Sequence, residues 1–191
     1  MSGTLYIVST PIGNLKDITL RGLEVLKLSK YILAESSVRS SKLLNEYNIN
    51  KKIITFNKDN EKRKINSINR DLSEGANICL ISDAGTPSIS DPGFELIRSI
   101  ESPINVVPIP GPSSLTAALS ISQIPINKFL FLGFLSKKQK EREGQLLQIK
   151  DMLLPAVVFE SKHRLISLLK NIVYILGPNT KVSIMKELTK L

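Results

Sequence analysis

The chain has 191 residues, 42% of them hydrophobic, and a formal net charge of +9 at pH 7. This apolar content is enough for a folded core, but no apolar run approaches the roughly 18 to 20 residues of a membrane-spanning helix. The N-terminus lacks the features of a secretory signal, so we expect a cytoplasmic protein with no membrane partner. A single cysteine, Cys79, and a single histidine, His163, exclude an intrachain disulfide and Cys- or His-based metal clusters, so no metal is expected.

The first part of the chain alternates short apolar runs with segments of helical periodicity. The runs are rich in Ile, Leu and Val, as at 78–81, where Cys79 is expected to pack in the core. This β-α-β-α alternation predicts an α/β fold with a mostly parallel sheet and helices on its faces. We expect strands at 5–8, 31–34, 53–56, 78–81 and 106–109, and helices at 19–28 (capped by Asp17), 40–47 and 60–73.

A second alternation follows a short helix at 115–121 and a linker at 122–128. We therefore expect two α/β domains, 1–122 and 127–191. The second is short for an α/β unit and ends on a new strand, so it is expected to be incomplete. Its expected strands are 129–134, 156–159 and 182–185, and its expected helices are 141–152 and 163–176.

Three loops rich in Gly and Pro follow strands of the first domain. They are TPIGN at 10–14, SDAGTPSISDPG at 82–93 and PIPGPSS at 108–114. Gly and Pro fix loops in particular shapes, and in parallel sheets ligands bind beyond the carboxyl ends of the strands. We therefore expect the three loops to share one cleft. The phosphate-binding patterns of nucleoside triphosphate and dinucleotide sites are absent from the sequence.

The positive charge suits a phosphate-rich partner such as RNA, although solvated lysines of a Lys-rich chain would account for it equally. The segment KKQKERE at 137–143 is a more specific candidate, because it lies at an expected strand-to-helix transition. Contacts of this kind bind phosphates without reading sequence.

Taken together, these motifs resemble the ribosomal RNA small subunit methyltransferase I family of the tetrapyrrole methylase superfamily. The resemblance is carried by LYIVSTPIGNLKDITLRGLEVL, AGTPSISDPG, PGPSS, FLFLGFL, FES-HR and ELTK, in this order along essentially the whole chain. It implies two α/β domains of the tetrapyrrole methylase type with a cofactor cleft between them. The implied protein is a homodimer that uses S-adenosylmethionine to methylate the ribose 2′-hydroxyl of a cytidine in 16S rRNA of the small ribosomal subunit.

The resemblance also assigns site residues. The implied cofactor contacts are Ile12, Ala84, Gly85, Thr86, Ile89, Ser113, Ser114, Glu160 and Leu188. Candidates for a general base that removes the hydroxyl proton are Glu35, Asp83, Glu160 and His163, and each could equally be an ordinary residue at a strand or helix end. Candidate substrate contacts are Pro11, Asn14, Arg39, Lys137, Lys138 and Arg164.

The chain departs from the family pattern after two strands. Relatives typically carry A-E-D-T-R and then His after the second strand, whereas this chain has AESSVRSS at 34–41, which keeps Glu35 but places Ser36 and Val38 at polar positions. After the third strand, FNKDNE replaces a His-Glu-His run. These changes leave open a degenerate, catalytically weak or inactive member that binds RNA or cofactor. A small-molecule (tetrapyrrole) methylase is a further alternative, although TPIGN and GTP replace its usual Gly-rich and Gly-Asp-Pro segments.

Overall fold

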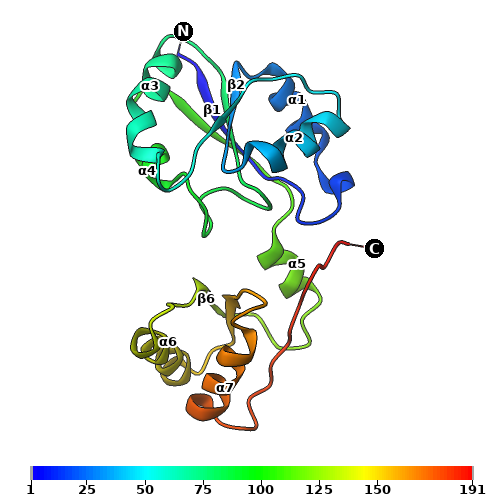
Figure 1. The fold of residues 1–191 in the computed structure, drawn as a ribbon, viewed down its shortest axis with the longest axis vertical. Coiled ribbons are helices and arrows are strands. Elements are labelled where there is room, and N and C mark those ends of the chain that lie inside the picture. The colour runs from blue at the N-terminus through cyan, green and yellow to red at the C-terminus, as the bar shows by residue number, and fades with distance from the viewer. Residues whose placement is uncertain (1, 191) are drawn as a thin grey trace. The chain divides into compact units, whose positions relative to one another are not determined.

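A computed structural model describes residues 2–190 and divides the chain into two compact units (Figure 1). Unit 1 takes in residues 2–114 and 187–190, and unit 2 takes in residues 115–186. The sequence placed the boundary at 122–127, which assigned the helix after the third loop to the first domain. In the structure that helix, α5 (Ser114–Ser120), belongs almost entirely to unit 2.

Unit 1 is built on a five-stranded sheet in the order β3-β2-β4-β1-β5, and every pair is parallel. The central strands β2 and β4 are fully buried, as expected for apolar runs covered on both faces. The expected α/β fold with a parallel sheet is thus confirmed. The strands are β1 (Thr4–Val8), β2 (Tyr31–Ala34), β3 (Ile53–Thr55), β4 (Ile78–Ile81) and β5 (Asn105–Ile109).

Helices cover both faces of this sheet (Figure 1). Val25, Leu26 and Leu44 of α1 and α2 join one buried cluster, which also contains Cys79, so the expected core position of the cysteine is confirmed. Ile68 and Leu72 of α3 join a second cluster on the opposite face, together with Leu96 of α4. The helices are α1 (Leu20–Leu28), α2 (Ser37–Glu46), α3 (Glu61–Ser73) and α4 (Phe94–Arg98), and a short 3₁₀ turn spans Leu15–Asp17.

The strand order creates a switch point around β4. The chain leaves β1 and β2 toward α1 and α2 on one face, but it leaves β4 toward α4 on the other. Loops that follow neighbouring strands therefore separate at this edge, which is where open α/β sheets hold ligands. The fold thus places the residues after β1, β2 and β4 around one candidate site.

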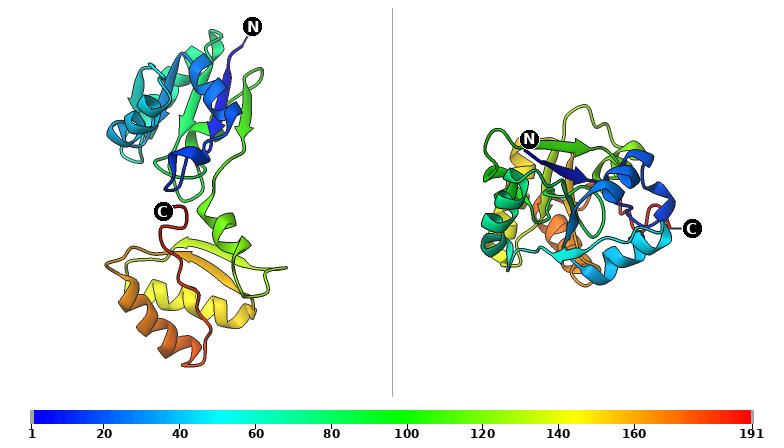
Figure 2. Two further views of the ribbon diagram at one scale, coloured as in Figure 1. Left: turned by 90° about the vertical axis from the view of Figure 1, so that its right-hand side faces the viewer. Right: turned by 90° about the horizontal axis from the view of Figure 1, so that it is seen from above.

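Unit 2 contains a parallel pair of strands, β6 (Leu130–Phe134) and β7 (Ala156–Phe159), with an irregularity in the register between Phe131 and Gly133. Helices α6 (Gln139–Met152) and α7 (Leu165–Leu176) lie side by side against the strands (Figure 2). Their shared core contains Leu135, Leu146, Leu168 and Ile175.

Three details of the sequence prediction were wrong. Residues 182–185 form no strand, and Val182 and Ile184 are 46% and 57% exposed, because an apolar run becomes a strand only where a neighbouring strand pairs with its backbone. The cap of α1 is Thr19 rather than Asp17, since the Thr19 hydroxyl accepts the Gly22 N–H. The short helix α4 was not predicted.

Within residues 2–190 no helix has the length and apolarity to cross a bilayer.

Candidate functional site

The loops after β1 and β4 are joined by a pair of backbone hydrogen bonds. Thr10 and Gly85 each donate their N–H to the other's carbonyl oxygen at 2.9 Å. Side chains reinforce this bridge, because the Thr10 hydroxyl donates to the Ser82 carbonyl at 3.0 Å and the Ser82 hydroxyl donates to the Gly85 carbonyl at 3.0 Å. The hydroxyls of Ser9 and Thr86 are hydrogen bonded at 2.9 Å. The two loops therefore form one connected structure.

Gly85 lies where these loops meet the third one. Its φ of +87° is a conformation that residues with a side chain rarely adopt, and a Cβ there would lie 3.6 Å from Ile12 Cγ2 and 3.9 Å from the Pro112 carbonyl oxygen. Ser9 meets the third loop as well, because its N–H donates to the Ile109 carbonyl and a Cβ on Gly111 would lie 3.0 Å from Ser9 Cβ. The three loops thus meet in unit 1, and the cleft that they are expected to share stays a prediction.

The rest of the loop at 82–93 is held tightly against the sheet. Gly93 has a φ of +130°, and a Cβ on it would lie 2.7 Å from both Leu80 Cδ2 and Ser88 Oγ, so no other residue fits without movement. Ser88 and Ser90 also have positive φ, at 69° and 65°. Strained backbone of this kind persists where the surroundings fix it and is frequent at functional sites.

A buried carboxylate on α3 supports the end of this loop. Glu61, 8% exposed, accepts the backbone N–H groups of Glu95 and Leu96 at 3.2 and 3.3 Å. These N–H groups belong to the first turn of α4, which begins after Gly93 without a side-chain cap of its own. Glu61 therefore caps α4 from outside the helix and links α3 to the loop.

Asp83, a candidate base, is occupied by contacts to α2. Its Oδ1 accepts the Ser36 N–H at 3.1 Å and its Oδ2 pairs with Arg39 Nη1 at 2.9 Å. The Asp83 side chain is 18% exposed, and that of Arg39 is 71% exposed. Arg39, a candidate substrate contact, thus reaches the edge of the sheet from α2 and remains accessible.

Asp91 is a further titratable residue of the site that sequence reasoning did not select. Burial is the main cause that raises the pKa of Asp91 to about 6, and the nearby carboxylates of Glu35 and Asp83 add to the shift. The neighbouring Ser82 hydroxyl and the charge of Lys58 oppose it. Asp91 therefore lies in the same group of acids as Glu35 and Asp83, which we call the acidic cluster. The available signal was its place in the SDPG end of the loop, but its burial beside two carboxylates depends on tertiary structure.

The other candidates of unit 1 lie on the three loops and on the segment 187–190. Pro11 is buried, Ile12 and Asn14 are half-buried, and Asn14 caps the turn at 15–17 by accepting the Lys16 N–H. Ala84 and Ile89 are exposed, the latter by 47%. Leu188 belongs to a segment that packs on the first loop, since a Cβ on Gly13 would lie 2.8 Å from Thr189 Oγ1. Ser113 and Ser114 are half-buried at the end of the third loop.

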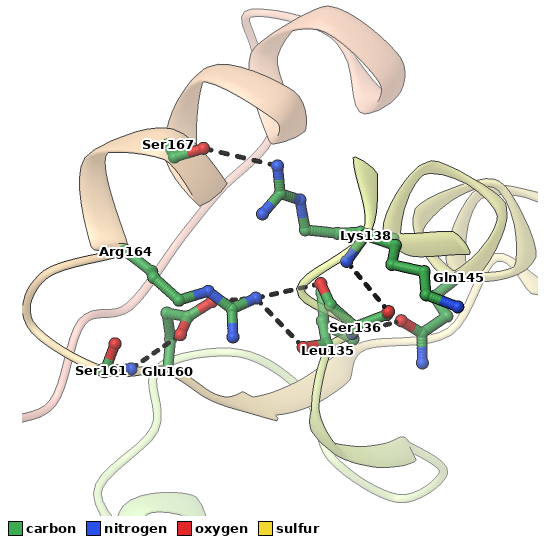
Figure 3. Close-up of polar contacts among 9 residues, drawn as sticks. Leu135, Ser136, Lys138, Gln145, Glu160, Ser161, Arg164 and Ser167 are labelled. Carbon is green, nitrogen blue, oxygen red and sulfur yellow. Dashed lines mark hydrogen bonds and ion pairs between the residues drawn. The ribbon is translucent and has the colours of Figure 1, made fainter. Parts of the chain in front are cut away.

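In unit 2, an ion pair joins the ends of the two strands (Figure 3). Arg164 Nη2 donates to the carbonyl oxygens of Leu135 and Ser136, after β6, at 3.0 Å each, and pairs with Glu160 Oε2, after β7, at 3.3 Å. The Glu160 side chain is 5% exposed, and its Oε1 accepts the Ser161 N–H at 2.7 Å. Glu160 and Arg164 thus form a connected group, whereas His163 between them is exposed.

The basic segment after β6 has a more open arrangement. Ser136 donates its hydroxyl to the Glu141 carboxylate at 2.7 Å and Lys138 pairs with it at 3.0 Å, and these two contacts, the first most strongly, lower the pKa of Glu141. Lys137 and Lys138 are both exposed.

Within residues 2–190, no group of three or more His, Cys, Asp or Glu side chains is placed to hold a metal ion.

Comparisons with known proteins match nearly the whole chain to one family. Residues 4–191 match the family model of tetrapyrrole (corrin/porphyrin) methylases. The chain is 44% identical, over 98% of its length and 66% of the relative, to a ribosomal RNA small subunit methyltransferase I of Escherichia coli O157:H7. For proteins of the same name, it is 43% identical to that of Halalkalibacterium halodurans (98% of this chain, 65% of the relative) and 45% identical to that of Thermotoga maritima (99% and 85%). The chain thus spans about two thirds of the length of the first two relatives.

Proposed function

Since this chain belongs to the tetrapyrrole (corrin/porphyrin) methylase family, and within it to the ribosomal RNA small subunit methyltransferases I, we propose that it transfers a methyl group from S-adenosylmethionine to RNA of the small ribosomal subunit. The observation that carries this proposal is the hydrogen-bonded bridge between Thr10 and Gly85 at the switch point of the sheet. It gathers three conformationally fixed loops at the edge where α/β sheets bind ligands.

The residues at this edge fit such a donor. Bound S-adenosylmethionine supplies an activated methyl group on a positively charged sulfonium. Gly85 presents backbone without a side chain, and Ala84 and Ile89 expose small and apolar surface. The acidic cluster of the same unit provides negative charge that favours a cation. The contacts proposed for the donor are Ile12, Ala84, Gly85, Thr86, Ile89, Ser113, Ser114, Glu160 and Leu188.

The proposed acceptor is the ribose 2′-hydroxyl of a cytidine in 16S rRNA. Methyl transfer is an in-line displacement, so the main task of the protein is to align the acceptor oxygen, and the fixed loops suit this task. A carboxylate that takes the hydroxyl proton would add roughly 10² to 10⁴-fold to the rate. Among the acids of unit 1, Asp91 suits this role best, because its pKa of about 6 is closer to neutrality than that of an ordinary aspartate, whereas Asp83 is held by Arg39 and the Ser36 N–H.

Further proposals concern the partners and the remaining candidates. Pro11, Asn14, Arg39, Lys137, Lys138 and Arg164 are proposed to contact the RNA. We also propose that the protein acts as a homodimer in the cytoplasm and that Glu35 and His163 are alternative proton acceptors.

One observation favours a second reading, in which the protein binds RNA or donor without catalysis. Val38, at the start of α2, is 71% exposed and stands where the resemblance expects a polar residue. An apolar residue there offers neither charge nor a hydrogen bond to a substrate.

Two linked measurements test the proposal. Calorimetry measures the binding of S-adenosylmethionine to the purified protein, and radiolabelled donor then measures methyl transfer to small ribosomal subunits that lack the modification. Binding with transfer to a ribose 2′-oxygen is the expected result. Binding without transfer would favour the non-catalytic reading, and absence of donor binding would contradict the proposed site.

A further inference from the structure

Helix α3 presents a row of cationic side chains to solvent. Lys62, Arg63 and Arg70 are exposed, as is Lys58 in the loop just before the helix. Arg63 and Arg70 are seven residues apart, which is close to two helical turns, so they lie on nearly the same face. The opposite face of α3 carries Ile68 and Leu72 into the core. We call Lys58, Lys62, Arg63 and Arg70 the α3 basic face.

This charge is not compensated locally. None of the four cations forms an ion pair with another residue of the described range 2–190. The acids on the same stretch are engaged elsewhere: Glu61 is buried under α4, and Asp71 pairs with Lys30 at 2.9 Å and accepts the Tyr31 hydroxyl at 2.8 Å. Two exposed acids lie close in sequence, Asp59 beside Lys58 and Glu74 four residues after Arg70, and neither forms an ion pair within residues 2–190. The face therefore keeps a clear excess of positive charge.

The position of two of these cations is unfavourable for the helix itself. Lys62 and Arg63 stand in the first turn of α3, at the positive end of the helix dipole, where acidic residues are preferred. A negatively charged group bound there would remove this repulsion. The helix dipole thus gives no stabilisation from cations at these positions.

The basic face begins beside the candidate site. All strands of unit 1 are parallel, so α3, which follows β3, starts at the same edge of the sheet as the loops that carry the acidic cluster. Lys58 is close enough for its charge to lower the pKa of Asp91. From there the cations continue along α3, on the sheet face opposite α1 and α2 (Figure 1).

We propose that the α3 basic face docks the phosphate backbone of the RNA substrate and leads it to the candidate site of unit 1. This inference rests on the proposed function for the class of its partner. Lysine and arginine contacts to phosphates supply affinity without reading sequence, and each contact makes binding more sensitive to salt. An RNA that follows α3 would reach the edge of the sheet at Lys58, next to Asp91.

The test compares two triple variants of equal charge. The first carries Lys62→Ala, Arg63→Ala and Arg70→Ala. The control carries Arg21→Ala, Lys27→Ala and Lys42→Ala, which removes three exposed charges from α1 and α2 on the opposite face. Filter binding to in vitro transcribed small-subunit ribosomal RNA, without methyl donor, is measured between about 50 and 200 mM salt, a range over which phosphate contacts change affinity strongly.

The α3 variant is expected to lower the slope of log affinity against log salt by about 2 to 3, since each phosphate contact contributes about 0.7 to 0.9. Its RNA affinity should fall at least tenfold more than that of the control, while its melting temperature stays equal to or above that of the unchanged protein. Equal losses in the two variants would overturn the α3 inference and leave the proposed function intact. Failure of the unchanged protein to bind the RNA would contradict both.

Discussion

At the scale of single residues, two glycines in different backbone conformations provide a test variant and its control. Gly85 has a φ of +87° at the junction of the three loops, whereas Gly144 lies inside α6, where an added Cβ would meet open space. Gly85→Ala should cost about 1 to 2 kcal/mol, because an L-residue is strained in this conformation. Gly144→Ala should stabilise the protein by roughly 0.5 to 1 kcal/mol, as expected inside a helix.

Chemical denaturation of both variants measures these changes. The affinity for S-adenosylmethionine distinguishes a local effect on the loop from an effect on overall stability. We expect Gly85→Ala to weaken donor binding and Gly144→Ala to leave it unchanged. Equal stability changes in the two variants would contradict the role given to the backbone of Gly85.

Asp91 should make stability depend on pH. Because its pKa is raised from 3.8 to about 6, the native protein holds a proton that the unfolded chain has released between these values. Stability should therefore fall as pH rises from about 4 to about 6, by linkage. Asp91→Asn should flatten the profile in this window. Asp71 acts in a different range: its pKa is lowered from 3.8, so its contribution is lost only as pH falls below that value.

Urea unfolding at a series of pH values measures this dependence. A slope between about pH 4 and 6 that is the same in the Asn variant would show that another group is responsible. The same variant also tests the proposed proton acceptor, since a catalytic role predicts a loss of methyl-transfer rate at saturating donor that exceeds any loss of donor affinity caused by the missing negative charge.

At the scale of elements, Asp83 connects the loop after β4 to the start of α2. Asp83→Ala removes the acceptor of the Ser36 N–H and the partner of Arg39, and should destabilise unit 1 by about 1 to 2 kcal/mol. Arg39→Ala should cost less than about 0.5 kcal/mol, because its side chain is 71% exposed and exposed ion pairs contribute little. Thermal unfolding of the two variants measures the difference, and a larger loss for Arg39→Ala would mean that the ion pair, not the backbone contact, holds α2.

The corresponding connection in unit 2 depends on Arg164. Its guanidinium binds two carbonyl groups and the nearly buried Glu160, so Arg164→Ala should destabilise unit 2 by about 2 to 4 kcal/mol, as is usual when a buried carboxylate loses its partner. Lys138→Ala breaks an exposed pair on the same unit and is the matched control, with an expected loss below about 0.5 kcal/mol. Comparable losses in denaturant unfolding would indicate that the Arg164 contacts contribute little.

At the scale of the whole molecule, local patterns predicted the α/β fold and most elements. The apolar runs at 31–34, 78–81 and 156–159 form strands with the expected bounds, and the first two are fully buried, as expected where helices cover a parallel sheet. The run at 182–185 looked the same in sequence, but strand formation depends on a pairing partner, which a local pattern does not contain.

Local sequence patterns predicted the loops of the candidate site but not the contacts between them. Gly and Pro marked the three loops correctly, since backbone conformation is a local property. The position of Asp91 beside Glu35 and Asp83, and the use of Glu61 as a cap for α4, arise from contacts between segments distant in sequence. Such contacts become visible only once the order of the strands is known.

The return of residues 187–190 to unit 1 makes unit 2 an insertion within unit 1, so the stabilities of the two units are coupled through the chain itself. While unit 2 is folded, residues 115–186 are not a flexible loop. If unit 2 unfolds, the last segment must close a long flexible loop to reach Gly13, and the entropy of closure weakens that contact. Leu168→Ala, in the core of unit 2, should therefore speed amide hydrogen exchange at 187–190 while β1 and β4 keep their protection. Equal protection of 187–190 in both proteins would show that this segment is held by unit 1 alone.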